Sequence, residues 1–505
     1  LGSDSVDNYY EYEIPLKLTP HGTYASSNAT DRYIVWPESN ELDVPLELFT
    51  KCKIARNGAK SSGLTLQDIY TMTDPDKVNN RVRIKGNPSL GNVVTMMVGL
   101  RAHGAGVKSA EVWINELRLT DFNEEGGWAA RGRTSIKLAD LGSVSASGQY
   151  SSVGFGSIDQ SVQERSMSEN AEFDISANLE LGKFFGQNSR LSIPFYAGYS
   201  RQVSTPEYSP YDSDVKLRTV LDNTDSKSVR DSIKSISQTT ETTKSINVTN
   251  LRLKPAKGQK NAIYSPSNLS ATYAYSEIKK TDPETEYDLE KEVNGQIAYN
   301  YSASPKPIEP FKSLKSKKPL AILAELAFYP QPSLLSYRWE LTRDYQEIQK
   351  RNVNNPTYVV PISVSKDFSW NRYLDFKYNI TKSLRFGLNT TVNARIDEPD
   401  VVVNKDRFPE EYKHWKDSNM TNLLHFGRTT NYQHTVDLNW TVPINRLPYL
   451  DFLSATAQYK GTYIWRAENQ GTGYNWGNII QNRQNEQLNG MVNLQTIYHK
   501  SKSLK

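Results

Sequence analysis

Apolar and polar residues alternate along most of the chain after residue 126, in runs that commonly reach twelve or more residues. In the run 171–181, AEFDISANLEL, every second position from Phe173 onward is apolar and the positions between them are polar. Successive side chains of a strand point to opposite faces, so such a run predicts a β-strand with one apolar and one polar face. The runs 132–138, 384–396 and 435–442 have the same period.

The length of these runs favours membrane-spanning strands over the strands of a soluble sandwich. Sandwich strands usually have about 5–6 residues, whereas a strand tilted across a bilayer needs about 9–11. Long and short connections alternate as in outer-membrane barrels, the largest covering 203–244, although 280–286 and 303–333 break the alternation. We therefore predict an all-β chain in which 123–505 forms about thirteen antiparallel transmembrane strands, the last at 486–499, as an arc of a very large outer-membrane β-barrel.

Aromatic residues gather near the ends of the runs, as at Phe184, Phe185, Tyr463 and Trp465, and the chain has 30 tyrosines. This distribution indicates an aromatic girdle at the membrane interfaces. Tyrosine is also common in soluble sheets, so that alternative stays open. Apolar residues within 213–236 predict short helices in the largest loop, which either cap a pore or pack the loop onto a rim.

Residues 1–122 have a different pattern, with short β-type runs separated by Gly, Pro and Asn. Examples are DRYIVW at 31–36, VVTMMVGLRA at 93–102 and AEVWINELRL at 110–119. Short strands at close spacing predict a two-sheet sandwich of the jelly-roll kind for this segment.

Composition narrows the class of protein further. Lys and Arg total 60 against 56 Asp and Glu, and this mixed net charge of +4 argues against a nucleic-acid-binding protein. The mean hydropathy is −0.63, and no apolar run approaches the roughly 18–20 residues of a spanning helix. A single cysteine, Cys52, excludes a disulfide framework and a thiolate metal cluster. Because the chain begins at Leu1 and ends in a basic tail, we expect it to be an interior part of a longer polypeptide.

A search for catalytic chemistry returns no candidate residues. The six histidines have no helical pairing suited to zinc, and HGAGVKS at 103–109 lacks the spacing of a phosphate-binding loop. The acidic stretch DFNEEGG at 121–127 does not fit a calcium-binding EF-hand loop. We therefore predict a protein that is not an enzyme, with no catalytic residues, no cofactor and no metal site.

Six motifs in fixed order resemble one family. They are NELRLTDF at 115–122, GGWAA at 126–130, LADLG at 138–142, VGFGSIDQSVQERS at 153–166, LELGKFF at 179–185 and VSTPEYSPYDSDVKL at 203–217. Together they resemble the SprA/Sov proteins, the outer-membrane translocons of type IX secretion in Bacteroidota, which are also linked to gliding motility. The resemblance implies a barrel in the outer membrane whose lumen passes folded cargo proteins with C-terminal sorting domains. It also implies a PorV-type shuttle barrel and a periplasmic plug protein as partners, besides outer-membrane lipid.

In such a barrel, the two faces of each strand meet lipid and a water-filled lumen. The apolar positions that we predict to face lipid are Phe173, Ile175, Leu179, Leu181, Leu384, Phe386, Leu388, Val436, Leu438 and Trp440. The polar positions that we predict to face the lumen are Arg131, Arg133, Lys137, Asp174, Asn178, Glu180, Arg385, Asn389, Arg395 and Asp437. The alternative function is a soluble cell-surface adhesin or a carbohydrate-binding β-sandwich array, against which strand length and loop alternation weigh.

Overall fold

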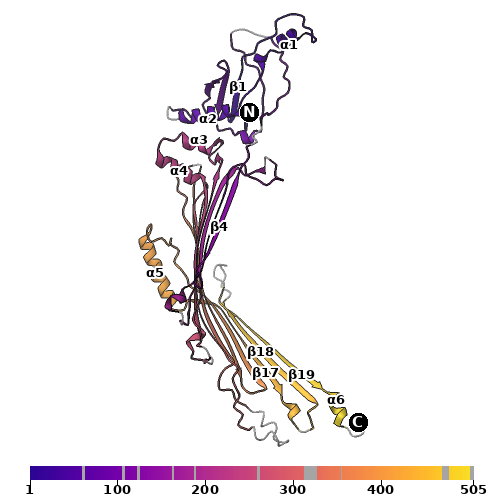
Figure 1. Ribbon diagram of the computed structural model, residues 1–505, viewed down its shortest axis with the longest axis vertical. Helices are drawn as coiled ribbons and strands as arrows, with labels where there is room; N and C mark the ends of the chain where they lie inside the picture. The colour runs from indigo at the N-terminus through magenta and orange to yellow at the C-terminus, as the bar shows by residue number, and fades with distance from the viewer. Residues whose placement is uncertain are drawn as a thin grey trace. The chain divides into compact units, whose positions relative to one another are not determined.

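The computed structural model divides the chain into two compact units, each described here by itself (Figure 1). The first unit combines 1–130, 150–170 and 204–238, and the second combines 131–149, 171–203 and 239–505. The described residues are 1–59, 63–104, 109–121, 125–161, 164–186, 189–256, 258, 262–311, 327–353, 355, 357–447, 449–468 and 477–500.

The first unit has a three-stranded antiparallel sheet in the order β1-β3-β2, with a helix packed on it. Its strands and helices are β1 Tyr9–Glu13, α1 Ala29–Val35, η1 Glu38–Asn40, α2 Leu46–Ala59, β2 Tyr70–Thr73, β3 Arg81–Lys85 and η3 Leu90–Asn92. The segment 204–238 adds β9 Tyr208–Ser209, β10 Asp212–Lys216, α3 Leu217–Asp222 and α4 Lys227–Ser237.

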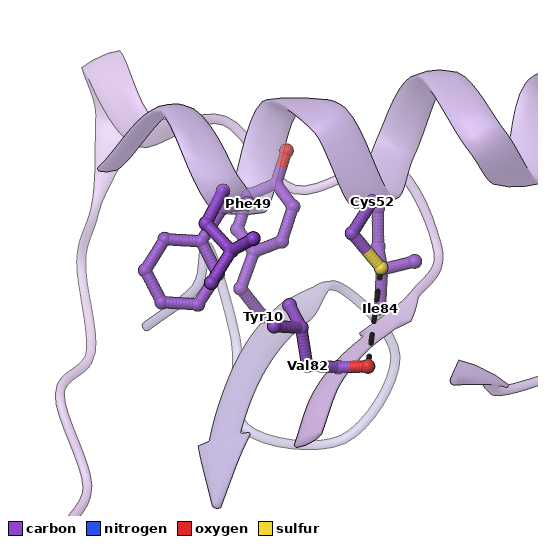
Figure 2. Packing of buried hydrophobic residues seen from close by; sticks show 6 residues of the cluster. Tyr10, Phe49, Cys52, Val82 and Ile84 are labelled. Carbon is purple, nitrogen blue, oxygen red and sulfur yellow. Dashed lines mark hydrogen bonds between the residues drawn. The ribbon is translucent and has the colours of Figure 1, made fainter. Parts of the chain in front are cut away.

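The core of this unit lies between α2 and the sheet (Figure 2). Its buried members are Tyr10, Leu48, Phe49, Cys52, Val82 and Ile84. Val82 and Ile84 alternate along β3 and so point to the same face, while Leu48 and Cys52 are one helical turn apart on α2. The ring of Phe49 lies 5.3 Å from that of Tyr10. The apolar residues of β3 and those of α2 therefore meet in one layer, and this unit has a hydrophobic core of its own.

The structure corrects the predicted sandwich. The described part of 1–122 has one sheet covered by a helix, without a second facing sheet. The run 31–36 lies largely in α1, and the described residues of 93–102 and 110–119 form no strand. The short apolar runs misled the prediction because α2 and a β-strand both place apolar residues at close spacing. The boundary also differs, since 150–170 and 204–238 join the first unit.

The second unit is built on a fourteen-stranded sheet among the described residues, in the order β19 down to β11, then β8, β6, β5 and β4, with β7 paired to β11. Its strands are β4 Ala129–Lys137, β5 Gly142–Ser151, β6 Ser168–Glu180, β7 Leu191–Ser192, β8 Pro194–Pro206, β11 Thr239–Leu253, β12 Leu269–Thr281, β13 Thr285–Ser302, β14 Leu334–Lys350, β15 Ser363–Asn379, β16 Leu384–Arg395, β17 Arg428–Val442, β18 Leu453–Arg466 and β19 Ile479–Val492. Its helices are η5 Leu181–Phe185, η6 Pro266–Asn268, α5 Pro409–Leu424, η10 Ile444–Arg446 and α6 Leu494–Lys500.

Neighbouring strands from β11 to β19 pair antiparallel, so the prediction of an all-β chain with antiparallel sheets is confirmed. The path through the described residues is open, with β4 at one edge and β19 at the other. No described helix combines the length and the apolarity that crossing a membrane requires.

Candidate functional site: the two faces of the strand sheet

Strand register brings the apolar side chains of β11–β18 onto one face of the sheet. Directly opposite residues of an antiparallel pair lie on the same side. Leu388 of β16 is opposite Phe376 of β15 and Val436 of β17, and Phe386 is opposite Tyr378 and Leu438. The alternation of single strands therefore becomes a continuous surface.

This surface, called the apolar band below, runs across eight strands. Its members include Ile246, Val248, Tyr273, Tyr275, Val293, Ile297, Leu335, Trp339, Leu374, Phe376, Phe386, Leu388, Val436, Leu438, Trp440, Tyr459 and Trp465. Several of these side chains are about half exposed, such as Ile246 at 43% and Ile297 at 49%. An exposed apolar surface that continues across several strands is typical of a face that contacts a membrane or a protein partner.

The opposite face is lined by amides, hydroxyls and charges that bind one another. The amide of Asn389 donates to Asp375, and Nδ2 of Asn393 donates to Oδ1 of Asn371 at 2.7 Å. Asp437 lies directly opposite Lys460, so opposite charges share a cross-strand position. This face, called the polar face below, is hydrogen-bonded within itself and carries both signs of charge.

The predicted lumen residues of β16 and β17 all belong to the polar face. They are Arg385, Asn389, Arg395 and Asp437. Arg131, Arg133 and Lys137 are exposed on β4, while Asp174 and Asn178 occupy alternate positions of β6. Glu180 is tied down, because its carboxylate accepts hydrogen bonds from Ile193 N at 2.6 Å and Ser192 Oγ at 3.1 Å. Whether the polar face meets a lumen stays a prediction.

The predicted lipid residues of β16 and β17 pair with one another across the two strands. The three pairs are Leu384 with Trp440, Phe386 with Leu438 and Leu388 with Val436. On β6, Phe173 and Ile175 are exposed and Leu179 is half-buried on the same side of the strand. That this side faces lipid likewise stays a prediction.

Leu181 is the exception among the predicted lipid residues, because it lies in η5 rather than on a strand. Its N–H donates to Ile193 O at 2.9 Å. At the next position, a Cβ on Gly182 would lie 2.1 Å from Leu191 O, so only glycine allows the two segments to approach this closely. The strand therefore ends one residue before the alternation does.

Arg372 is a polar residue of the apolar band that the alternation did not single out. It is opposite Trp339 and Val392, and its guanidinium lies 5.4 Å from the ring centre of Trp370 and 5.9 Å from that of Phe426. Arginine can bury its aliphatic stem and stack its guanidinium on aromatic rings. No signal short of the strand register could have placed Arg372 among these rings.

In the first unit, two carboxylates of the largest loop bind a buried lysine. Lys53 is 1% exposed, and its Nζ lies 2.6 Å from Asp212 Oδ1 and 3.2 Å from Asp214 Oδ2. Tyr10 Oη donates to Asp214 at 2.7 Å, and Leu90 N donates to the other oxygen at 2.7 Å. Burial, followed by this bond to Asp214, raises the pKa of Tyr10 well above its usual range. This cluster, called the Lys53 latch below, holds the segment 212–217 within the first unit.

Two neighbours of the latch are buried ionisable groups. Arg56 donates to Gly86 O, and burial lowers the pKa of its guanidinium. Burial raises the pKa of Cys52 to about 11. Both groups lie in or beside the core. Burial, which disfavours the charged form, is therefore enough to explain both pKa shifts.

The structure brings together no group of three or more His, Cys, Asp or Glu side chains that could hold a metal ion, as far as the described residues extend. His103 Nε2 lies 2.5 Å from Glu13 Oε1, an ordinary surface pair. Residues 105–108 of HGAGVKS and residues 122–124 of DFNEEGG lie outside the described residues.

Comparison with known proteins finds one family match, over the first 221 residues. Residues 1–221 match the SprA_N family, described as a motility related/secretion protein. The match covers the first unit's core, the Lys53 latch and the strands from β4 to β8. No curated protein matches the chain. The match confirms the resemblance to the SprA/Sov family over these residues and indicates a protein of motility or secretion.

Proposed function

We propose that this SprA/Sov-family chain forms an arc of an outer-membrane channel through which folded proteins leave the cell in type IX secretion and gliding motility. One observation carries the proposal: a single antiparallel sheet has a continuous apolar band on one face and a polar face on the other. A sheet of this kind is stable where lipid covers one side and water the other. The family match supports the secretion class.

The dimensions of the strands agree with a bilayer. The paired strands from β11 to β18 have 12–18 residues, more than the roughly 9–11 that cross the hydrocarbon layer at a tilt. The residues in excess reach into the headgroup layers and the loops. Closure of the barrel by further strands is part of the proposal.

In this proposal the channel is passive and has no catalytic chemistry of its own. Its polar face carries both signs of charge, as at Asp437 and Lys460. It also has an acidic row, in which Glu292, Asp344 and Asp367 lie directly opposite one another on β13, β14 and β15. The proposed partners are cargo proteins with C-terminal sorting domains, a PorV-type shuttle barrel, a periplasmic plug protein and outer-membrane lipid. These partners rest on the family resemblance alone.

Two adjacent cysteine substitutions on β16 test which face meets water. In the full-length protein in intact cells, we expect a membrane-impermeant maleimide to label Asn389→Cys at least tenfold faster than Leu388→Cys. The native Cys52 is fully buried, so the unsubstituted protein is the control for background labelling. Equal labelling at both positions would instead support a soluble adhesin or carbohydrate-binding array.

A second arm of the experiment tests transport. Conjugates of increasing size on Asn389→Cys are expected to reduce the release of large cargo before small cargo. The same conjugates on Arg218→Cys, an exposed position of α3, are the control and should leave release unchanged. Release that does not depend on conjugate size at position 389 contradicts a lumen on this side.

A further inference from the structure

The connection between β16 and β17 folds back over the apolar side of the sheet. Phe426, at its end, stacks on Trp370 with ring centres 5.3 Å apart, and Trp370 is opposite Leu341 and Ala394 on the same face as the band. Arg407, near its middle, donates to Tyr287 Oη at 3.0 Å. Figure 1 shows α5, in orange, beside the strands. This connection, residues 397–426, is called the α5 segment below.

A buried ion pair fixes one side of the α5 segment to the sheet. Glu398 accepts two hydrogen bonds from Arg343 of β14, at 2.5 and 2.9 Å, and a third from Trp415 Nε1 of α5 at 2.7 Å. The Arg343 guanidinium also lies 4.9 Å from the ring centre of Trp415. Burial alone would raise the pKa of Glu398, but the bonds to Arg343 outweigh burial and lower it, so the carboxylate stays charged. One side of α5 therefore packs on the sheet.

The helix runs along the strands, from their loop end toward the band. Its 16 residues span about 24 Å at a rise of about 1.5 Å per residue. Along β13, the eight steps from Tyr287 to Gly295 span about 26 Å at about 3.3 Å each. Just before the helix begins, Arg407 contacts Tyr287. Just beyond its end, Phe426 stacks on Trp370, which lies in the same cross-strand row as Gly295. The length of the helix agrees with the length of this stretch of β13, so α5 runs along the strands toward the apolar band.

The side of α5 that faces away from the sheet changes from charged to apolar along this descent. Lys413, Lys416, Met420 and Leu424 are three or four residues apart and so form one stripe, which also includes Asp417 beside Lys416. Lys413 and Lys416 are exposed at its upper end. At its lower end Met420 is 54% exposed and Leu424 72%, and Phe426 beyond the helix is 52% exposed.

We propose that the α5 segment is a lipid-binding element, which lies at the boundary between the headgroup and acyl layers and inserts Met420, Leu424 and Phe426 among acyl chains. The change from lysine to apolar side chains along one helix is the profile of the membrane interface. Lipid is the proposed occupant because the exposed apolar end of α5 adjoins the apolar band through the stacked rings of Trp370 and Phe426. The inference rests on the proposed function in one respect, namely that the band faces lipid.

Quenching by brominated lipid tests this proposal on the full-length protein in phosphatidylethanolamine and phosphatidylglycerol vesicles. A fluorophore is attached to Leu424→Cys, or to Met420→Cys as a second variant on the same stripe. Both positions are exposed, so the fold does not depend on them. Phe386→Cys reports on the band, and Ser228→Cys, exposed on α4 of the first unit, reports on water.

Bromine placed in mid-chain is expected to quench the probes at 424 and 386 at least threefold more than the probe at 228. Quenching at 386 without quenching at 424 and 420 overturns the inference and leaves the proposed function standing. Absence of quenching at 386 overturns both. A probe at 424 that is shielded from aqueous iodide but not quenched by bromine reveals a protein partner on this helix, and likewise overturns the lipid assignment.

Discussion

The two units differ in where their apolar side chains lie. The first unit encloses its apolar residues, so that Cys52, Val82 and Ile84 are fully buried between a helix and a sheet. The second unit displays them on one face, where Ile297 and Trp440 stay about half exposed. The first unit therefore has a buried core of its own, whereas the apolar side chains of the sheet lie mostly on its surface. Four changes test this contrast.

The largest effect is expected in the Lys53 latch. Asp214→Ala removes a partner of a lysine that has almost no access to water, and breaking such a buried pair costs about 3–5 kcal/mol. The free energy of unfolding of the first unit is measured by urea-dependent labelling of Cys52. Asp222→Ala on α3, whose side chain is 73% exposed, is the control and should change it by about 0.5 kcal/mol or less. Equal effects would show that the latch is not a stabilising contact.

An enclosed core responds to truncation more than an exposed face does. Ile84→Ala is expected to cost the first unit about 2–5 kcal/mol, because it leaves a cavity beside Cys52 and Val82. The matched substitution Ile297→Ala on the band, with the protein in vesicles, is expected to cost less than half of that, since lipid fills the space. Urea unfolding of both variants provides the comparison, and similar losses at both sites contradict the contrast between the units.

A charge on the band should be harmful where the same charge on the polar face is tolerated. Leu388→Arg is expected to destabilise the membrane-inserted protein by about 2–4 kcal/mol. Asn389→Arg, one position along β16, meets Asp375 on the neighbouring strand and should change stability by about 1 kcal/mol or less. Unfolding in vesicles measures both. A larger loss of stability in Asn389→Arg than in Leu388→Arg would show that the lipid and lumen faces have been assigned the wrong way round.

The smallest effect concerns pH and the first unit alone. Burial raises the pKa of Cys52 from 9.0 to about 11, so folding favours the neutral thiol. The stability that this contributes is fully present below pH 9 and is lost as the pH rises through about 11, by at most about 3 kcal/mol in total. Stability of the first unit is measured between pH 8 and 11 by urea unfolding, followed with a fluorophore on Ser228→Cys of α4. In Cys52→Ala the pH dependence should shrink, and an unchanged slope would assign it to other groups.

The sequence predicts the local geometry of the sheet well. Alternation in β16 places Leu388 and Asn389 on opposite sides because strand geometry alone decides this. The assignment of these sides to lipid and lumen remains a prediction, since periodicity does not name the solvent. The last strand begins seven residues earlier than predicted, at Ile479, and 494–500 is helical. Weak alternation in IIQNRQN hid its start.

The features that the sequence did not predict depend on contacts between distant residues. Lys53 meets Asp214 across 161 positions, and neither residue has a local pattern that marks it as buried. Likewise, Arg372 is placed among the rings of Trp339 and Trp370 by strand pairing rather than by its neighbours in sequence. Glu398 and Arg343, 55 positions apart, anchor α5 in the same way. Such pairs become visible only after the register is known.

The composition of the first unit from three separate segments has a consequence for its folding. Since 131–149 and 171–203 intervene, Asp212 and Asp214 can reach Lys53 only after the intervening chain, which contains β4, β5, β6 and β8, has been closed into loops. Contacts this far apart in sequence slow folding, because the intervening chain must first be ordered. The pairing of Lys53 with Asp212 and Asp214 is therefore expected to form later in folding than the contacts between α2 and β3, which lie within 1–130.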